Sequence, residues 1–133
     1  MPSTRLVANR WIRKYTKAWS EKDAKTIASL FAEDATYHSH PFRPAHQGRK
    51  GVLEYTLGAL DVQEVYEVRF GKPVVEGPRA AVEYWTTMKE KTEDVTLAGC
   101  VMLHFAKNGL CKELRDYWVL KTGRETVPPN WGR

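Results

Sequence analysis

Residues 15–48, YTKAWSEKDAKTIASLFAEDATYHSHPFRPAHQG, decide the order of the first elements of the chain. They begin inside an amphipathic helix, because apolar residues recur every three or four positions along it. Its apolar face consists of Val7, Trp11, Tyr15, Ala18 and Trp19. A polar break over positions 20–23 separates this helix from the next element.

A second helix is predicted after the break, with Asp23 as its N-cap. We expect this helix to end in the segment LFAEDA, residues 30–35, and its inner face to hold Ala24, Ile27, Ala28, Leu30 and Phe31. A short strand over Ala35–His38 follows. It should end at His40-Pro41, because proline donates no backbone hydrogen bond and holds the preceding residue in extended geometry. A loop then leads to a third, short helix that begins near Gly48.

The second half of the chain has the period of strands. Val62, Tyr66, Val68 and Phe70 alternate with polar residues and predict one strand. Three further strands are predicted over the ranges Ala80–Lys89, Thr96–Phe105 and Leu110–Leu120. Asn108-Gly109 is a strong hairpin turn between the last two. Helices followed by antiparallel strands indicate an α+β fold.

Composition indicates one compact domain that spans residues 1–133. The chain has 133 residues, of which 42% are hydrophobic, enough to bury a core without cross-links. Its two cysteines, Cys100 and Cys111, form no disulfide framework, which favours a reducing compartment. No apolar signal core precedes Trp11, and no segment has the roughly 20 apolar residues of a membrane span. We therefore expect a cytoplasmic protein without a membrane partner.

The charge pattern leaves two interpretations open. The net charge is +5, and Arg10, Arg13, Lys14 and Lys17 share one face of the first helix. This face could attract nucleic acid or anionic lipid, or it could simply be the solvated side of the helix. Acidic residues are scattered among the basic ones elsewhere, and no motif of a nucleic-acid-binding module occurs, so we expect no nucleic-acid partner.

The chain resembles the nuclear-transport-factor-2-like superfamily, and within it the SnoaL-like polyketide cyclases and ketosteroid isomerases. The resemblance rests on Tyr15 with Asp23 eight residues later, the segment 30–35, Pro41, Gly48 and the pair His104-Phe105. It implies a cone-shaped fold with three N-terminal helices packed on a curved, mostly antiparallel sheet. The mouth of such a cone holds a small apolar molecule.

The resemblance also implies roles for three positions. Tyr15 stands where ketosteroid isomerases have a tyrosine that donates a hydrogen bond to the substrate oxygen. His40 stands where they have a proton-shuttling aspartate before a proline, and a histidine can serve as a base near neutral pH. Leu103 replaces a second acid, so this position can only form part of an apolar ligand-binding wall, and steroid isomerisation is not expected.

Strand alternation predicts which side chains face the cone. If Leu114 points inward, so do Asp116 and Trp118 on the same strand; Tyr84 then points inward on a neighbouring strand. Asp116 would be a poorly solvated carboxyl, whose pKa is raised toward the range of a general acid or base; alternatively it is a structural partner of an arginine. The expected apolar wall around Asp116, His40 and Tyr15 consists of Trp19, Tyr55, Tyr84, Trp118 and Leu103.

A metal site is the weaker hypothesis. His38, His40 and His46 are three imidazoles of the kind that bind zinc, and His38 and His40 share a strand face. However, the bond to Pro41 redirects the chain after His40. We therefore expect no metal and no cofactor.

The sequence thus predicts a small-molecule-binding protein, which we expect to be a cofactor-independent acid–base enzyme of isomerase, cyclase or dehydratase type. The alternative is a non-catalytic ligand-binding or dimerisation module on the same fold, since fold does not settle function. The outward-facing set of strand residues is too apolar for a free surface and predicts a homodimer through the convex sheet face. This set consists of Trp85, Cys100, Met102, Tyr117 and Val119.

Overall fold

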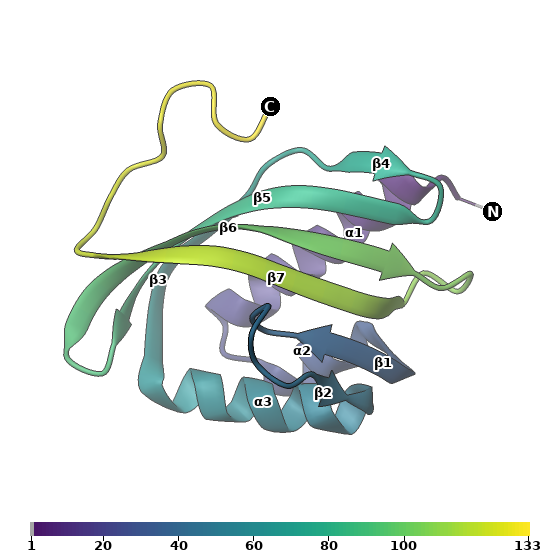
Figure 1. Ribbon diagram of the computed structural model, residues 1–133, viewed down its shortest axis with the longest axis horizontal. Helices are drawn as coiled ribbons and strands as arrows, with labels where there is room; N and C mark the ends of the chain where they lie inside the picture. The colour runs from purple at the N-terminus through teal and green to yellow at the C-terminus, as the bar shows by residue number, and fades with distance from the viewer. Residues whose placement is uncertain (1) are drawn as a thin grey trace.

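Three helices pack in the curve of a seven-stranded sheet (Figure 1). The computed structural model describes residues 2–133. The helices are α1 (Thr4–Ser20), α2 (Ala24–Ser29) and α3 (Gly48–Val62). The strands are β1 (Phe31–His38), β2 (His46–Gln47), β3 (Gln63–Phe70), β4 (Val74–Glu76), β5 (Arg79–Glu90), β6 (Glu93–Phe105) and β7 (Cys111–Thr122).

The sheet is mostly antiparallel, with the order β2-β1-β7-β6-β5-β3 and with β4 paired to β5. Only β1 and β7 run parallel to each other. The predicted α+β, cone-shaped fold of the nuclear-transport-factor-2-like type is therefore confirmed. No helix within residues 2–133 is both long enough and apolar enough to cross a membrane.

Capping residues set the starts of the first two helices. The Ser3 side chain accepts a hydrogen bond from the Leu6 backbone N–H, and Asp23 accepts one from Thr26. Each satisfies a donor that the first turn of a helix leaves without a partner. The predicted N-cap at Asp23 is confirmed.

The second helix is shorter than predicted. It ends at Ser29, and strand β1 begins at Phe31, inside the segment that we expected to be helical. The Leu30 carbonyl accepts hydrogen bonds from the Trp11 indole on α1 and from the Cys111 backbone N–H at the start of β7. These two donors fix the backbone between α2 and β1. Pairing with the start of β7 therefore overrides the local helical pattern. Helix α3, in contrast, is longer than the short helix that the sequence predicted.

The strands of the second half lie where the sequence placed them, with one correction in β3. The pairing of β3 with β5 shifts register between Val65 and Glu67, so that Tyr66 is the extra residue of a β-bulge. Tyr66 was expected on the same face as Val68, but its hydroxyl instead donates a hydrogen bond to Asp94 on the outside. The predicted turn at Asn108-Gly109 is present, and Gly109 has a φ of +85° there.

The core fills the space between the helices and the concave face of the sheet. It joins the inner faces of α1 and α2 to alternate residues of β1, β5, β6 and β7. Its largest fully buried side chains include Phe31, Ile27, Met88, Leu103 and Leu114.

Candidate functional site

A small cavity of about 90 Å³ lies between α1, α3 and the concave face of the sheet. Aromatic and aliphatic side chains form most of its wall, and Asp116 is the one carboxylate among its lining residues. These residues are Tyr15, Trp19, Tyr37, Tyr55, Gln63, Val65, Val68, Phe70, Tyr84, Thr86, Met88, Leu97, Val101 and Asp116. An apolar hollow with a few inward polar groups is the usual composition of a small-molecule site.

Strand alternation brings Tyr84 and Asp116 together inside this cavity. On the central strand β6, Gly99 pairs with Tyr84 of β5, and Val101 pairs with Asp116 of β7. The Tyr84 hydroxyl donates a hydrogen bond to the Asp116 carboxyl at 2.9 Å. The predicted inward orientation of Tyr84 on β5 and of Asp116 on β7 is therefore confirmed.

Gly99 makes room for the Tyr84 ring. A Cβ atom at this position would lie 2.6 Å from Cε1 and 2.7 Å from Cζ of Tyr84. It would also lie 2.7 Å from the backbone oxygen of Tyr117. The ring can therefore cross β6 toward Asp116 only because this residue has no side chain.

Burial changes the acidity of Asp116. Removal of the carboxyl from water raises its pKa to about 7, and the hydrogen bond from Tyr84 lowers it by a smaller amount. Desolvation dominates because it penalises the charged form of the carboxyl, whereas one hydrogen bond only partly replaces the lost water. At neutral pH Asp116 thus exists in both protonation states and can either give or accept a proton.

The tyrosines around Asp116 keep their protons. Burial raises the pKa values of Tyr15, Tyr37, Tyr55 and Tyr84, and the nearby Asp116 charge raises them further. The hydroxyls of Tyr15 and Tyr37 lie 3.4 Å apart, and either can be the donor of that hydrogen bond. Because only one of the two donates to the other, the second hydroxyl keeps a hydrogen for a ligand oxygen.

The structure places only part of the predicted site at this cavity. Tyr15, Trp19, Tyr55 and Tyr84 line it together with Asp116. Leu103 lies in the core instead and is 1% exposed. It forms no part of the cavity wall because the wall of β6 is built from Leu97 and Val101.

His40 and Trp118 lie outside the cavity as well. The His40 ring accepts a hydrogen bond from the Phe42 backbone N–H and stands 5.2 Å from the Trp118 ring. The Trp118 indole donates to the Ser39 carbonyl at 2.8 Å. Both side chains border a depression that also contains the outward residues Tyr117 and Val119. The turn at Pro41 thus directs His40 toward the outer face and away from Tyr15 and Asp116.

Sequence reasoning missed Tyr37, which lines the cavity and is 2% exposed. The signal was available, because Tyr37 alternates with His38 on the predicted strand and shares the inward face of Ala35. The contribution of β3 through Gln63, Val65, Val68 and Phe70 was also missed. The bulge in this strand changes its alternation, so the inward set could not be found by counting.

The histidines do not converge as a metal site would require. The His46 ring is tilted against the Tyr55 ring, with centres 4.5 Å apart, and His46 pairs across strands with Tyr37, whereas His38 alternates to the opposite face of β1. Within residues 2–133 no group of three or more histidine, cysteine, aspartate or glutamate side chains is arranged to hold a metal ion.

Comparison with known proteins agrees with this arrangement. A model of the SnoaL-like domain matches residues 12–114. The chain belongs to the SnoaL-like family. No curated protein matches it.

Three solved structures share the fold at low sequence identity. The epoxide hydrolase/cyclase-like enzyme SalBIII, of pyran ring formation in the polyether salinomycin, has a TM-score of 0.76 and 18% identity over 86% of this chain and 95% of its own. A Bacillus subtilis protein provisionally named an isomerase has a TM-score of 0.75 and 18% identity, and the match covers 89% of this chain and 90% of that protein. An LEH-like epoxide hydrolase of M. tuberculosis has a TM-score of 0.74 and 15% identity, and the match covers 88% of this chain and 86% of that protein.

Proposed function

We propose that this SnoaL-like protein is a cofactor-independent acid–base enzyme that acts on a small apolar molecule in the cone. The observation that carries the proposal is Asp116, a carboxyl in an apolar cavity with a pKa raised to about 7. A group with a pKa near the working pH is the most effective proton-transfer catalyst. Perturbed acids inside a pocket also concentrate at functional sites.

The geometry supports a proton transfer between carbon atoms. The Asp116 carboxylate takes a proton from a carbon that lies between a carbonyl group and a C=C bond and becomes neutral. The electrons of the broken C–H bond form a new C=C bond to the carbonyl carbon, and the C=O π electrons move onto the carbonyl oxygen. Tyr15 and Tyr37 supply the hydroxyl hydrogen that stabilises this negative oxygen. Asp116 then returns the proton to a different carbon, which completes an isomerisation.

The same groups suit a second direction of proton flow. A protonated Asp116 can give its proton to the oxygen of a hydroxyl or of a strained ether as the C–O bond breaks. Cyclase, dehydratase and epoxide-opening chemistry begin in this way. The structural neighbours, a cyclase-like enzyme, a provisionally named isomerase and an epoxide hydrolase, support acid–base chemistry of this breadth.

A turnover panel in D₂O tests the proposal. Small apolar enones, ketones and epoxides are incubated with the protein, and ¹H NMR follows both product formation and deuterium uptake at carbon. We expect at least one compound to react and Asp116→Asn to lower its rate by about a hundred- to ten-thousand-fold. The matched control is Asp61→Asn, which changes an exposed aspartate on α3 and should react like the wild type. Equal rates for wild type and Asp116→Asn would overturn the proposal.

A non-catalytic ligand-binding module is the second candidate, because fold does not settle function, and the size of the cavity limits both candidates alike. About 90 Å³ is below the roughly 300–1,000 Å³ of most ligand pockets. A larger substrate must therefore displace wall side chains such as Trp19 or Val65. Saturable binding of panel compounds, with neither turnover nor deuterium uptake by the wild type, would favour the binding module over the enzyme.

We also propose that the chain forms a homodimer through the convex sheet face. Met102, Tyr117 and Val119 are 41%, 42% and 70% exposed on this face. Trp85 belongs to the same predicted set, but the C-terminal segment covers it. Its indole donates to the Glu125 carbonyl, and its ring meets Trp131 edge-on at 6.3 Å. The part of the face left for a second copy is therefore centred on β6 and β7.

A further inference from the structure

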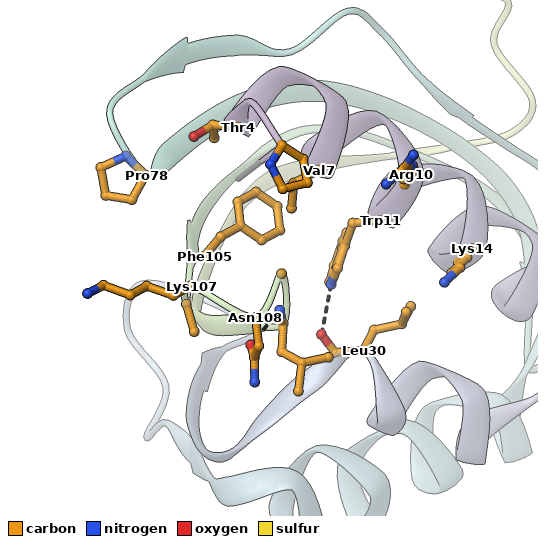
Figure 2. A pocket seen from close by; sticks show the side chains of 14 residues that line it. Thr4, Val7, Arg10, Trp11, Lys14, Leu30, Pro78, Phe105, Lys107 and Asn108 are labelled. Atoms are coloured by element: carbon orange, nitrogen blue, oxygen red, sulfur yellow. Dashed lines mark hydrogen bonds between the residues drawn. The ribbon is translucent and has the colours of Figure 1, made fainter.

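A second hollow lies at the opposite end of α1 from the cone cavity. It has a volume of about 330 Å³, within the range of ligand pockets. Its wall comes from the first half of α1, the end of α2, the β4–β5 turn at Pro78, and the turn between β6 and β7 (Figure 2). Among residues 2–133 none lines both this groove and the cone cavity. We call this second hollow the basic groove.

The floor of the basic groove is apolar. Trp11 and Phe105 form it, with their ring centres 6.2 Å apart and nearly perpendicular planes. Val7, Leu30 and Leu110 extend the apolar surface around them. The Trp11 indole N–H already donates to the Leu30 carbonyl at 2.8 Å, as Figure 2 shows. The Trp11 and Phe105 rings are only 3% and 6% exposed, so the half-buried Val7 and Leu110 above them supply the accessible apolar surface.

The charged groups of the groove are all cations. Arg10 and Lys14 lie one helical turn apart on α1, and Lys107 stands on the β6–β7 turn. No aspartate or glutamate belongs to the lining, and none of the three cations takes part in an ion pair within the part of the chain that the structure describes. Three unneutralised cations beside an apolar floor attract a molecule with an anionic head and an apolar body.

We propose that the basic groove binds an alkyl carboxylate. The alkyl chain lies against Val7 and Leu110, over the buried rings of Trp11 and Phe105, and the carboxylate meets the guanidinium of Arg10 and the ammonium of Lys14. Arginine binds carboxylates through paired N–H groups, and apolar chain burial supplies the remaining affinity. The sequence left the basic face of α1 as either a solvated surface or an anion site. On this proposal Arg10 and Lys14 bind the anion, and Arg13 and Lys17 are the solvated part of the face.

NMR of the ¹⁵N-labelled full chain with decanoate tests this site. We expect saturable shifts of the Trp11 indole N–H and of the Asn108, Gly109 and Leu110 amides. Amides of the cone strands at Leu97 and Val101 should move far less. Decanol and decyltrimethylammonium have the same alkyl length without the negative head, and we expect each to bind at least tenfold more weakly than decanoate.

Charge reversal supplies the matched variants. Arg10→Glu with Lys14→Glu should weaken decanoate binding at least tenfold. Arg13→Glu together with Lys25→Glu makes the same change of charge at exposed positions that do not line the groove, and should change the affinity less than twofold. The proposal is overturned if both double variants lose affinity equally, if decanol binds as tightly as decanoate, or if the shifts centre on the cone cavity. It is equally overturned if decanoate shows no saturable binding.

Discussion

The Tyr84 hydroxyl reaches across the central strand β6 and donates a hydrogen bond to Asp116 at 2.9 Å. This contact joins β5 and β7, the two strands that flank β6. It also acts against burial, because it stabilises the carboxylate that burial destabilises. The acidity of Asp116 therefore depends on a balance that single substitutions can shift in a known direction.

Replacement of Tyr84 by phenylalanine should raise the pKa of Asp116. Tyr84→Phe keeps the ring that excludes water and removes the donor that favours the charged form. The pH at which Asp116 titrates should therefore move above its wild-type value. A ¹³C carboxyl NMR titration of both proteins measures this change. A lower pKa in the variant would show that water enters in place of the hydroxyl and outweighs the lost hydrogen bond.

Gly99→Ala should damage the site by displacing the Tyr84 ring. The added methyl would lie within 2.7 Å of that ring and of the Tyr117 carbonyl, too close for any ordinary contact. Overpacking of this kind costs about 1–3 kcal/mol in the free energy of unfolding, which urea denaturation measures. Gly58→Ala is the control, because its Cβ would meet nothing within 4 Å on helix α3. The control should gain about 0.5–1 kcal/mol. Equal effects for the two substitutions would show that Tyr84 is not held by Gly99.

The stability of Asp116→Asn relative to wild type should depend on pH. The folded-state pKa of Asp116 is raised to about 7 from 3.8, so the folded wild type binds more protons than the unfolded chain between these values. Its stability contribution is complete below pH 3.8 and is lost as the pH rises through 7. An asparagine does not titrate, and its amide oxygen can still accept the Tyr84 hydrogen bond.

Between pH 5 and pH 8 the variant should therefore gain about 2–3 kcal/mol relative to wild type. Urea denaturation of both proteins at the two pH values measures the difference, in which the contributions of other titrating groups cancel. A relative stability that stays constant with pH would mean that Asp116 has an ordinary pKa and is well solvated.

Val119→Glu should separate the proposed dimer into monomers. Val119 is 70% exposed on the apolar convex surface, and a charge buried there without a partner would be costly. Sedimentation of the wild type at micromolar concentration should give twice the chain mass of 15.3 kDa, and the variant should give the chain mass itself. Leu57→Glu changes an apolar residue with 55% exposure on helix α3, on the concave side of the sheet, and should remain dimeric. A monomeric wild type would contradict the proposal.

Local pattern was sufficient for most of the fold because the inward residues of β5 keep strict alternation. Val82, Tyr84, Thr86 and Met88 all face the interior, as counting by two predicts. The boundary between α2 and β1 could not be predicted in this way. It depends on hydrogen bonds to Leu30 from Trp11 and Cys111, which lie 19 and 81 positions away in the chain.

Alternation predicted the Tyr84–Asp116 pair of the candidate site, but it did not predict how far the cavity extends along each strand, since Leu103 and Trp118 lie outside it. Asp116 and Tyr84 follow from strand register, and Tyr15 from the helical period of α1. His40 was misplaced because the direction of a side chain after a strand depends on the turn at Pro41, which the sequence does not specify. The bulge at Tyr66 could not be predicted from the sequence either. One extra residue in β3 exchanges the two faces of the strand.

The pKa of Asp116 in the wild-type protein is the most direct test of the account, because it requires no knowledge of the substrate. With aspartate labelled at the side-chain carboxyl carbon, a ¹³C NMR titration assigns the Asp116 signal by its loss in Asp116→Asn. The account predicts an apparent pKa of about 7. A value near 3.8, the ordinary pKa of an aspartate, would mean that the carboxyl is solvated and permanently charged at neutral pH, and would contradict its role as the acid–base group of the cone.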